Sequence, residues 1–252
     1  MAYFDGQVAI VTGGGSGIGQ STAHILGREG AKVVIANRTP AKGDAVAQEV
    51  IDAGGEAIYV QCDIGKADQV ETLVKKTVSH FGGLHIAVNN ASIGGPNSPI
   101  ADYPLEDWEL VTQINLVGTF YCMKYQLAAM VPNGGGAICN ITSILGDVGA
   151  NSGISAYVAS KHGIVGLTKS AALEYAAQGV RVNAVGPGYI DTPLLDRYRG
   201  TPEIWAALNA AHPVGRIGTS GEVAELIVWL CSERASFCTG GYYAVDGGYL
   251  AQ

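Results

Sequence analysis

Basic residues are scarce in this chain of 252 residues, which has 15 Lys and Arg against 22 Asp and Glu and a formal net charge of −7. The few cations are scattered, whereas a nucleic-acid-binding surface needs a dense basic patch. We therefore expect no nucleic-acid partner. No apolar run reaches the roughly 18 residues that a membrane-spanning helix requires, so we also expect no membrane association.

Cysteine is sparse as well, and its pattern argues against two common uses. The five cysteines are widely spaced, and no Cys-x-x-Cys occurs. An odd number of distant thiols fits neither a disulfide framework nor a zinc site. The five histidines show no ligand spacing, so we expect no metal. Reduced thiols and the lack of a basic, apolar leader predict a cytoplasmic protein.

Glycine, in contrast, is abundant, with 36 residues that separate short apolar runs. Continuous apolar runs are typical of strands buried on both faces of a sheet. Such strands are predicted at 8–11, 32–36, 57–60, 84–88, 137–141, 180–185 and 242–245. Helical periodicity predicts helices at 21–28, 41–53, 67–81, 105–130, 156–177, 202–211 and 222–231. This alternation predicts a single α/β domain over residues 1–252, a doubly wound parallel sheet with helices on both faces.

The turn after the first predicted strand, Thr12-Gly-Gly-Gly-Ser-Gly-Ile-Gly19, is rich in glycine. Glycine lets the backbone approach a pyrophosphate, and the following helix start offers free N–H groups to an anion. Its place at the first βα turn favours a dinucleotide site over a merely flexible turn. The expected cofactor contacts in this turn are Gly13, Ser16, Gly17, Ile18 and Gly19.

After the second predicted strand, Asn37 and Arg38 stand where the choice between NAD and NADP is made. A carboxylate there binds the adenosine ribose of NAD, whereas a guanidinium can clamp the 2′-phosphate of NADP. We therefore expect NADP(H), with NAD(H) as the alternative. Asp63 and Ile64 follow the third predicted strand. Asp63 could meet the adenine edge, or it could be a turn residue or a helix N-cap ahead of Ala67.

Tyr157 and Lys161 stand four residues apart in a predicted helix, so their side chains share one face. A free tyrosine has a pKa of about 10, and a neighbouring cation lowers it by stabilising the phenolate. Such a pair could exchange a proton with a substrate oxygen. Taken alone, it could equally be a surface tyrosine beside a surface lysine.

Together these segments resemble the short-chain dehydrogenase/reductase family over residues 7–249. The resemblance is carried by Thr12-Gly-Gly-Gly-Ser-Gly-Ile-Gly19, Asn89-Asn-Ala91, Asn115, Ser143, Tyr157-Val-Ala-Ser-Lys161 and Pro187-Gly-Tyr-Ile-Asp-Thr192. It implies a seven-stranded Rossmann sheet, a nicotinamide cofactor and metal-free interconversion of a carbonyl and an alcohol. Asp246-Gly-Gly248 is similar to the family's C-terminal turn, which implies a homotetramer.

The resemblance also implies roles for single residues. Tyr157 would be the general acid in reduction and the general base in oxidation. Lys161 would lower the pKa of Tyr157 and bind the nicotinamide ribose. Ser143 would hold the substrate oxygen near Tyr157, and Asn115 would hold a water that links Lys161 to solvent.

The implied cofactor contacts beyond the glycine turn lie after two other strands: Asn89, Asn90, Ala91, Pro187, Gly188, Ile190 and Thr192. In one respect the chain departs from the family pattern, because Ser143 lies 14 residues before Tyr157 where many relatives have 13. We attribute the extra residue to loop length, with Ser152 or Ser155 as the alternatives to Ser143.

Residues 191–212 are expected to form a lid over the substrate. Apolar side chains there and nearby predict a pocket for a hydrophobic ketone or secondary alcohol. The expected substrate contacts are Ile93, Ser143, Leu145, Tyr157, Tyr189, Leu194, Leu195, Tyr198 and Trp205.

Two other functions stay open at this point. One is a 3-oxoacyl-thioester reductase, which is weakened because residues 131–136 and 176–179 lack cations that could dock an acidic carrier near the expected mouth. The other is a redox sensor that binds a dinucleotide without turnover. A sensor could lose Ser143, Tyr157 or Lys161, and the presence of all three favours an enzyme.

Overall fold

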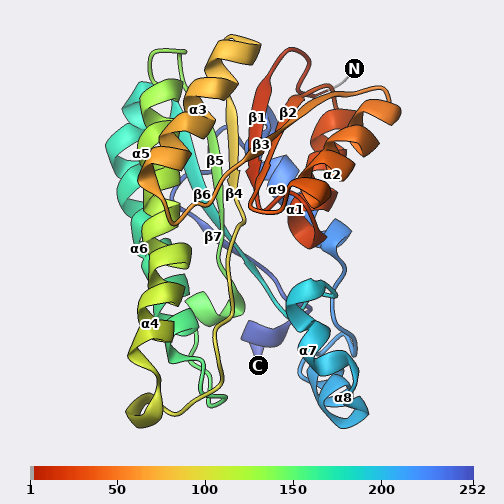
Figure 1. Cartoon of the computed structure of the whole chain (residues 1–252). Helices are drawn as coiled ribbons and strands as arrows, with labels where there is room; N and C mark the ends of the chain where they lie inside the picture. The colour runs from red at the N-terminus through yellow and green to blue at the C-terminus, as the bar shows by residue number, and fades with distance from the viewer. Residues whose placement is uncertain (1–2) are drawn as a thin grey trace.

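The computed structural model describes residues 3–252 and contains one parallel sheet with helices on both sides (Figure 1). Its strands are β1 (Val8–Thr12), β2 (Lys32–Asn37), β3 (Glu56–Gln61), β4 (Ile86–Asn89), β5 (Gly136–Ile141), β6 (Val180–Pro187) and β7 (Tyr242–Val245). Their order across the sheet is β3-β2-β1-β4-β5-β6-β7, and every pairing is parallel. The predicted seven-stranded, doubly wound fold is therefore confirmed.

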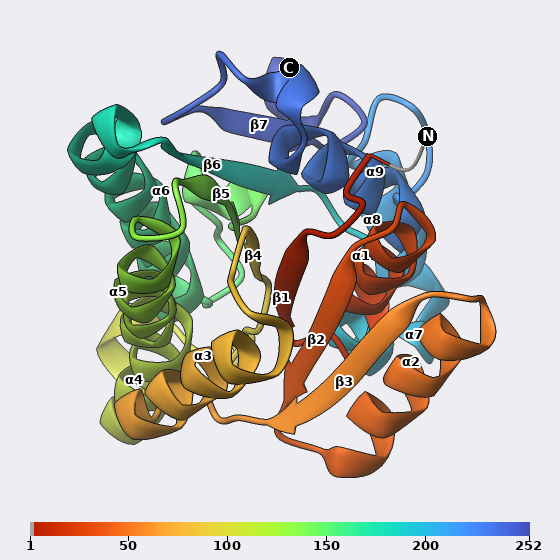
Figure 2. The ribbon, with the colours of Figure 1, turned by 90° about the horizontal axis from the view of Figure 1, so that it is seen from above.

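The helices pack in two layers, one on each face of the sheet (Figure 2). They are α1 (Gly17–Arg28), α2 (Pro40–Asp52), α3 (Ala67–Phe81), α4 (Leu105–Thr112), α5 (Gly118–Met130), α6 (Ser155–Tyr175), α7 (Asp196–Arg199), α8 (Pro202–Ala210) and α9 (Ser220–Cys231). α1, α2 and α9 cover one face, and α3 to α6 cover the other. Short α7 and α8 lie beyond the lower end of the sheet in Figure 1, within the predicted lid.

The sheet has a hydrophobic core on each face, and alternate residues of a strand belong to opposite cores because successive side chains point to opposite faces. Val11 and Ile35 pack under α1, α2 and α9, while Ile10 and Val34 pack under α3 and α5. All four side chains are fully buried. Burial on both faces is what the continuous apolar runs of the sequence predict.

One predicted helix is more complex than its periodicity suggests. The segment 105–130 is helical throughout, but residues Gln113–Val117 form a π-helical turn between α4 and α5. A π turn inserts an extra residue and rotates the side chains that follow it, and such turns are frequent at functional sites. Asn115 lies in this turn.

The chain reverses its direction of winding between β3 and β4, so β1 and β4 are neighbours with helices on opposite faces. The crevice at the carboxyl ends of such strands is where open α/β sheets bind ligands. Within residues 3–252, no helix combines the length and the apolar character that crossing a membrane requires.

Candidate active site

A cavity of about 590 Å³ opens at the carboxyl edge of the sheet and is lined by the segments that follow β1 to β6. Most of the predicted site residues line it. They are Gly13, Ser16, Gly17, Ile18, Asn37, Arg38, Asp63, Ile64, Asn90, Ala91, Ile93, Ser143, Leu145, Tyr157, Lys161, Pro187, Gly188, Tyr189, Ile190, Thr192, Leu194, Leu195 and Tyr198. Gly19, Asn89, Asn115 and Trp205 are not among its lining residues.

The glycine turn forms a cradle that side chains would fill. Gly13 and Gly17 have φ of +63° and +54°, a conformation that glycine adopts without strain. A Cβ on Gly13 would lie 2.9 Å from the Cα of Ala91. Ser16 precedes α1 without a side-chain cap, so the N–H groups of the first turn of α1 stay available to an anion. These residues fit the pyrophosphate of a dinucleotide.

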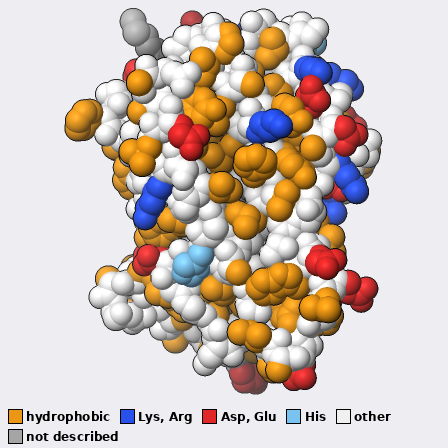
Figure 3. All heavy atoms as spheres, turned by 90° about the vertical axis from the view of Figure 1, so that its left-hand side faces the viewer, with side chains coloured by type: hydrophobic (Ala, Val, Ile, Leu, Met, Phe, Trp, Pro, Cys, Tyr) orange, Lys and Arg blue, Asp and Glu red, His pale blue; other side chains and the backbone are white. Residues whose placement is uncertain are grey.

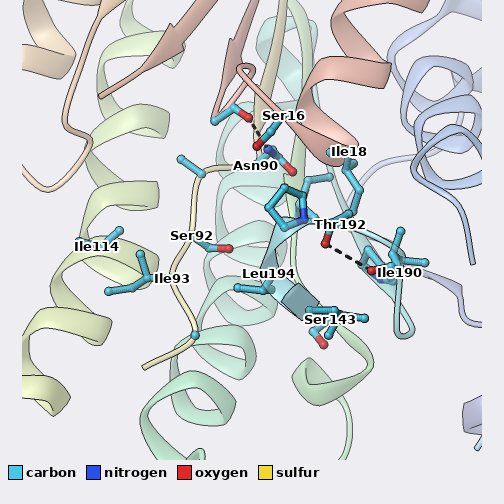
Figure 4. A pocket seen from close by; sticks show the side chains of 18 of the residues that line it. Ser16, Ile18, Asn90, Ser92, Ile93, Ile114, Ser143, Ile190, Thr192 and Leu194 are labelled. Atoms are coloured by element: carbon cyan, nitrogen blue, oxygen red, sulfur yellow. Dashed lines mark hydrogen bonds between the residues drawn. The ribbon is translucent and has the colours of Figure 1, made fainter. Parts of the chain in front are cut away.

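Gly19 and Asn89 do not line the cavity but pack behind the glycine turn and the end of β4. A Cβ on Gly19 would lie 2.3 Å from the carbonyl oxygen of Gly13, so glycine is needed for α1 to pack on this turn. Asn89 is buried and donates to Gln126 and Asn140, at 3.0 and 2.9 Å. Asn90 faces the cavity, and its Nδ2 donates to the Gly13 carbonyl at 3.1 Å (Figure 4).

The part of the cavity beside the end of β2 has two cations where the sequence suggested one. Arg38 and Lys42 both line the cavity beside Gly15, and a Cβ on Gly15 would touch the Lys42 side chain at 3.1 Å. Lys42 was not expected from the sequence because it lies inside α2, four residues beyond Arg38. At Asp63, the carboxylate accepts from the Gly65 N–H at 3.0 Å, as a turn residue does. The residue at the N-cap of α3 is Lys66.

Tyr157 and Lys161 both face the cavity from α6, with the Lys161 Nζ 5.3 Å from the centre of the Tyr157 ring. Lys161 is only 2% exposed, and its Nζ donates to the Ile141 carbonyl at 2.9 Å. Burial lowers the pKa of Lys161 to about 7, because a desolvated ammonium is costly. The surface-pair interpretation does not apply to a lysine so deeply buried.

The direction of the Tyr157 shift is opposite to that expected from a neighbouring cation alone. Burial first, and then the nearby Tyr189, raise the pKa of Tyr157, which comes to about 12. The Ser143 hydroxyl, which donates to the phenol oxygen, is the group that lowers this pKa. The phenol is therefore protonated at neutral pH and can donate a proton.

Ser143 follows β5 and lines the cavity, whereas Ser152 and Ser155 do not. Its Oγ accepts a hydrogen bond of 3.1 Å from the Leu145 N–H. The hydroxyl proton of Ser143 remains available for donation, because this bond uses only an acceptor lone pair. The position of this hydroxyl supports the alignment that assigns the extra residue to the following loop.

Asn115 supports the cavity wall from the π turn. Its Oδ1 accepts from the Ile93 N–H and its Nδ2 donates to the Ile93 carbonyl, both at 2.9 Å. Nδ2 also contacts the Ser160 Oγ at 3.3 Å. Asn115 thus fixes Ile93, a cavity residue labelled in Figure 4, against α6. The water-holding role that the resemblance implies stays a prediction.

The segment over the cavity is attached to two other loops. From α7, the Arg197 Nη1 donates to the Gly95 carbonyl at 3.1 Å and to the Asn97 Oδ1 at 3.2 Å. Asn97 in turn donates to the Ser152 carbonyl at 2.9 Å. Arg197 lines the cavity although no local pattern indicates it, since its partners lie about a hundred residues away. Trp205, in α8, instead stacks on Arg199.

The segments 131–136 and 176–179 do not lie near the mouth of the cavity, so the expectation that placed them there is wrong. They lead into β5 and β6, at the amino edge of the sheet. The Gly136 N–H donates to the Gly179 carbonyl there, at the end opposite to the cavity. Their composition therefore says nothing about docking at the mouth.

No group of three or more His, Cys, Asp and Glu side chains within residues 3–252 is arranged to hold a metal ion. The groups that Ser143, Tyr157 and Lys161 present to the cavity are a hydroxyl, a phenol and an amine.

A family model described as enoyl-(acyl carrier protein) reductase matches residues 13–250. A cyclohexanol dehydrogenase from Acinetobacter sp. (strain SE19) is 42% identical, covering 99% of this chain and 97% of the relative. A cis-4-hydroxycyclohexanecarboxylate dehydrogenase from Sinomonas cyclohexanicum is 45% identical, with 98% of each chain covered. The structure of a protein from Beutenbergia cavernae, described as an NAD(P)-dependent gluconate 5-dehydrogenase with NADP bound at low occupancy, matches with a TM-score of 0.93 at 36% identity over 98% of both chains.

Proposed function

Because the chain belongs to the short-chain dehydrogenase/reductase family of oxidoreductases, we propose that it interconverts a hydrophobic cyclic secondary alcohol and its ketone with NADP(H), using Tyr157 as acid and base. The observation that carries this proposal is the meeting of Ser143, Tyr157 and Lys161 in the cavity that also contains the glycine turn. The ring-shaped substrate is suggested by the activities of the two relatives and by apolar cavity residues such as Ile93 and Leu145.

The bound cofactor supplies a hydride acceptor for oxidation and a hydride donor for reduction. In oxidation, Tyr157 takes the hydroxyl proton of the alcohol while the carbon-bound hydrogen leaves as hydride. In reduction, Tyr157 returns a proton to the oxygen that becomes negative. The Ser143 hydroxyl donates to this oxygen in both directions and stabilises the developing charge in a water-poor site.

Lys161 supports the charged form of Tyr157. Burial disfavours the phenolate and the ammonium when each is alone, as the shifts of both pKa values show. At 5.3 Å from the ring centre, the ammonium attracts the phenolate strongly because little water screens the pair. The two charges therefore form more easily together than separately.

Tyr157→Phe tests the chemistry. We expect the oxidation of cyclohexanol, followed as NADPH absorbance at 340 nm, to fall at least about 100-fold, because general acid–base catalysis contributes about that much or more. NADPH should still bind, which fluorescence titration can show. Tyr175→Phe, on the same helix but away from the cavity, is the matched control and should keep wild-type turnover. Turnover by Tyr157→Phe close to wild type would remove Tyr157 from this role.

The cofactor preference depends on Arg38 and Lys42. A 2′-phosphate would lie between two cations, whereas the hydroxyl of NAD gains little from either. We expect the double variant Arg38→Ala/Lys42→Ala to weaken NADPH by about 100-fold or more and NADH by only a few-fold. Lys66→Ala, which removes a cation outside the cavity, is the control. Equal weakening of both cofactors would refute the preference and leave NAD(H) as the alternative.

A 3-oxoacyl-thioester reductase is the second candidate, favoured by a 3-oxoacyl-[acyl-carrier-protein] reductase from Synechocystis sp. that is 40% identical over 99% of this chain. The two functions separate in one assay, in which acetoacetyl-CoA and cyclohexanone compete for reduction by the same enzyme. A kcat/KM for the thioester well above that for the ring ketone would favour the second candidate.

We also propose that the chain assembles into a homotetramer, as the resemblance implies. The outer face of α4 to α6 carries exposed apolar side chains, among them Leu105, Phe120 and Leu173 (Figure 3). Exposed apolar side chains gathered on one outer face support self-association. Size-exclusion chromatography with light scattering measures the mass directly, and a monomer would refute the proposal.

A further inference from the structure

Ser143 is held in place by a residue from the far end of the sequence. The Tyr242 Oη, on β7, donates a hydrogen bond of 2.9 Å to the Ser143 carbonyl oxygen. The same carbonyl accepts from the Gly146 N–H at 2.8 Å, and the Ser143 Oγ accepts from the Leu145 N–H at 3.1 Å. The backbone and the hydroxyl of Ser143 are thus fixed by separate bonds.

The Tyr242 side chain has to cross a whole strand to make this contact, because β6 lies between β5 and β7. Tyr242 is paired with Ala184, and its ring lies over Gly186, two residues farther along β6. A Cβ on Gly186 would lie 2.1 Å from the Tyr242 Oη and 2.4 Å from its Cζ. Gly186 does not have a positive φ, so the ring and not the backbone conformation excludes a larger residue.

We propose that Tyr242 is a positioning residue for the reaction, whose hydroxyl, admitted by Gly186, fixes the Ser143 hydroxyl against Tyr157 and the substrate oxygen. The inference rests on the proposed function, in which Ser143 donates to that oxygen. Ser143 has no bulky side chain to anchor it, so the bonds to its backbone decide where its hydroxyl lies.

The Tyr242 hydroxyl is well suited to act as a permanent donor. Burial, and then the carboxylates of Asp147 and Asp246, raise the pKa of Tyr242 above its ordinary value. The phenol therefore keeps its proton over the whole working range of pH. Its donation to the Ser143 carbonyl does not depend on the protonation state of Tyr157.

Tyr242→Phe removes the hydroxyl and keeps the ring. A small displacement of a catalytic group can cost up to about 100-fold in rate, and we expect kcat to fall about tenfold. The KM for NADPH should not change, since Tyr242 is not among the residues that line the cavity. Tyr243→Phe is the matched control: its ring packs on the opposite face, beside the α1–α9 core, and its turnover should equal that of wild type.

The same substitution in a Ser143→Ala background separates positioning from a general structural effect. If Tyr242 acts through Ser143, Tyr242→Phe changes nothing further once the serine hydroxyl is gone. An equal tenfold loss in both backgrounds, or no loss in either, would overturn the inference. Gly186→Ala, which pushes the ring away, should repeat the pattern and serves in place of Tyr242→Phe should that variant not fold.

The two proposals fail in different ways. Full turnover by Ser143→Ala, or none by wild type, would refute the proposed function and this inference with it. Wild-type turnover that needs Ser143 but not the Tyr242 hydroxyl would refute this inference alone.

Discussion

Lys161→Met in the cofactor-free protein gives a direct measure of what burying an ammonium costs. Methionine is about as long as lysine and carries no charge, so the substitution keeps the volume near β5 and removes the titration. Between its folded pKa of about 7 and its ordinary value of 10.5, Lys161 is protonated in the unfolded chain but largely neutral in the folded one. The unfolded state thus binds more protons, and stability rises with pH across this window.

The magnitude follows from these two values. From pH 7 to pH 9, the contribution of Lys161 to the free energy of unfolding should rise by about 2 kcal/mol, at up to 1.36 kcal/mol per pH unit. Below pH 7 both states carry the proton and the penalty is fully present. We therefore expect Lys161→Met to be most stable relative to wild type near pH 7, with its advantage shrinking by about 2 kcal/mol at pH 9.

Urea unfolding of both proteins at pH 7, 8 and 9 measures this difference, and the other titrating groups cancel because both chains contain them. Lys169→Met, an exposed lysine on the same helix, is the control. Its ammonium is solvated in the folded and unfolded states alike, so its curve should run parallel to that of wild type. If the free energy of unfolding changed with pH in the same way for Lys161→Met and wild type, the Lys161 ammonium would not be desolvated. The proposed coupling between Lys161 and Tyr157 in a water-poor site would then be refuted.

Two further substitutions test the cavity walls. Arg197→Met removes the two hydrogen bonds between α7 and the loop at Gly95 and Asn97. In steady-state kinetics we expect the KM for the alcohol to rise roughly tenfold, with little change in the KM for NADPH. An unchanged KM for the alcohol would contradict a lid role. Gly19→Ala places a Cβ within 2.3 Å of the Gly13 carbonyl oxygen, so it should lower the stability by about 1–3 kcal/mol and remove most of the cofactor affinity. Gly166→Ala in α6, where a Cβ meets nothing within 4 Å, should instead stabilise the protein slightly. Thermal unfolding with and without NADPH measures both effects.

The sheet could be predicted closely because its signal is local. The strands are short apolar runs in the sequence, so β1 to β7 fall within about two residues of the predicted bounds. The π turn at Gln113–Val117 could not be predicted, because periodicity over 105–130 stays helical when a single extra residue is inserted.

The candidate site likewise contains some residues that the sequence indicates and some contacts that it does not. Tyr157 and Lys161 stand on one helix face, which their spacing reveals, whereas Ser143 is indicated by the resemblance to the family. The contacts that hold them join residues far apart in sequence, such as Tyr242 with Ser143, and no local pattern marks them. The direction of the Tyr157 shift also escaped sequence reasoning. Spacing shows that a cation is near, but only the fold shows how far water is excluded.

The segment that contains α7 and the start of α6 are connected through the loop at residues 95–98. Arg197 of α7 holds Gly95 and Asn97, and Asn97 holds the Ser152 carbonyl, three residues before α6 begins. The Ser98 N–H adds a bond of 2.8 Å to the Gly153 carbonyl, where a Cβ would collide with the Ser98 backbone. Since Tyr157 lies in the first turn of α6, we expect a movement of α7 to shift the loop that precedes α6. If residues 191–212 close over a substrate, we expect these hydrogen bonds to shift the Tyr157 phenol at the same time, as in induced fit.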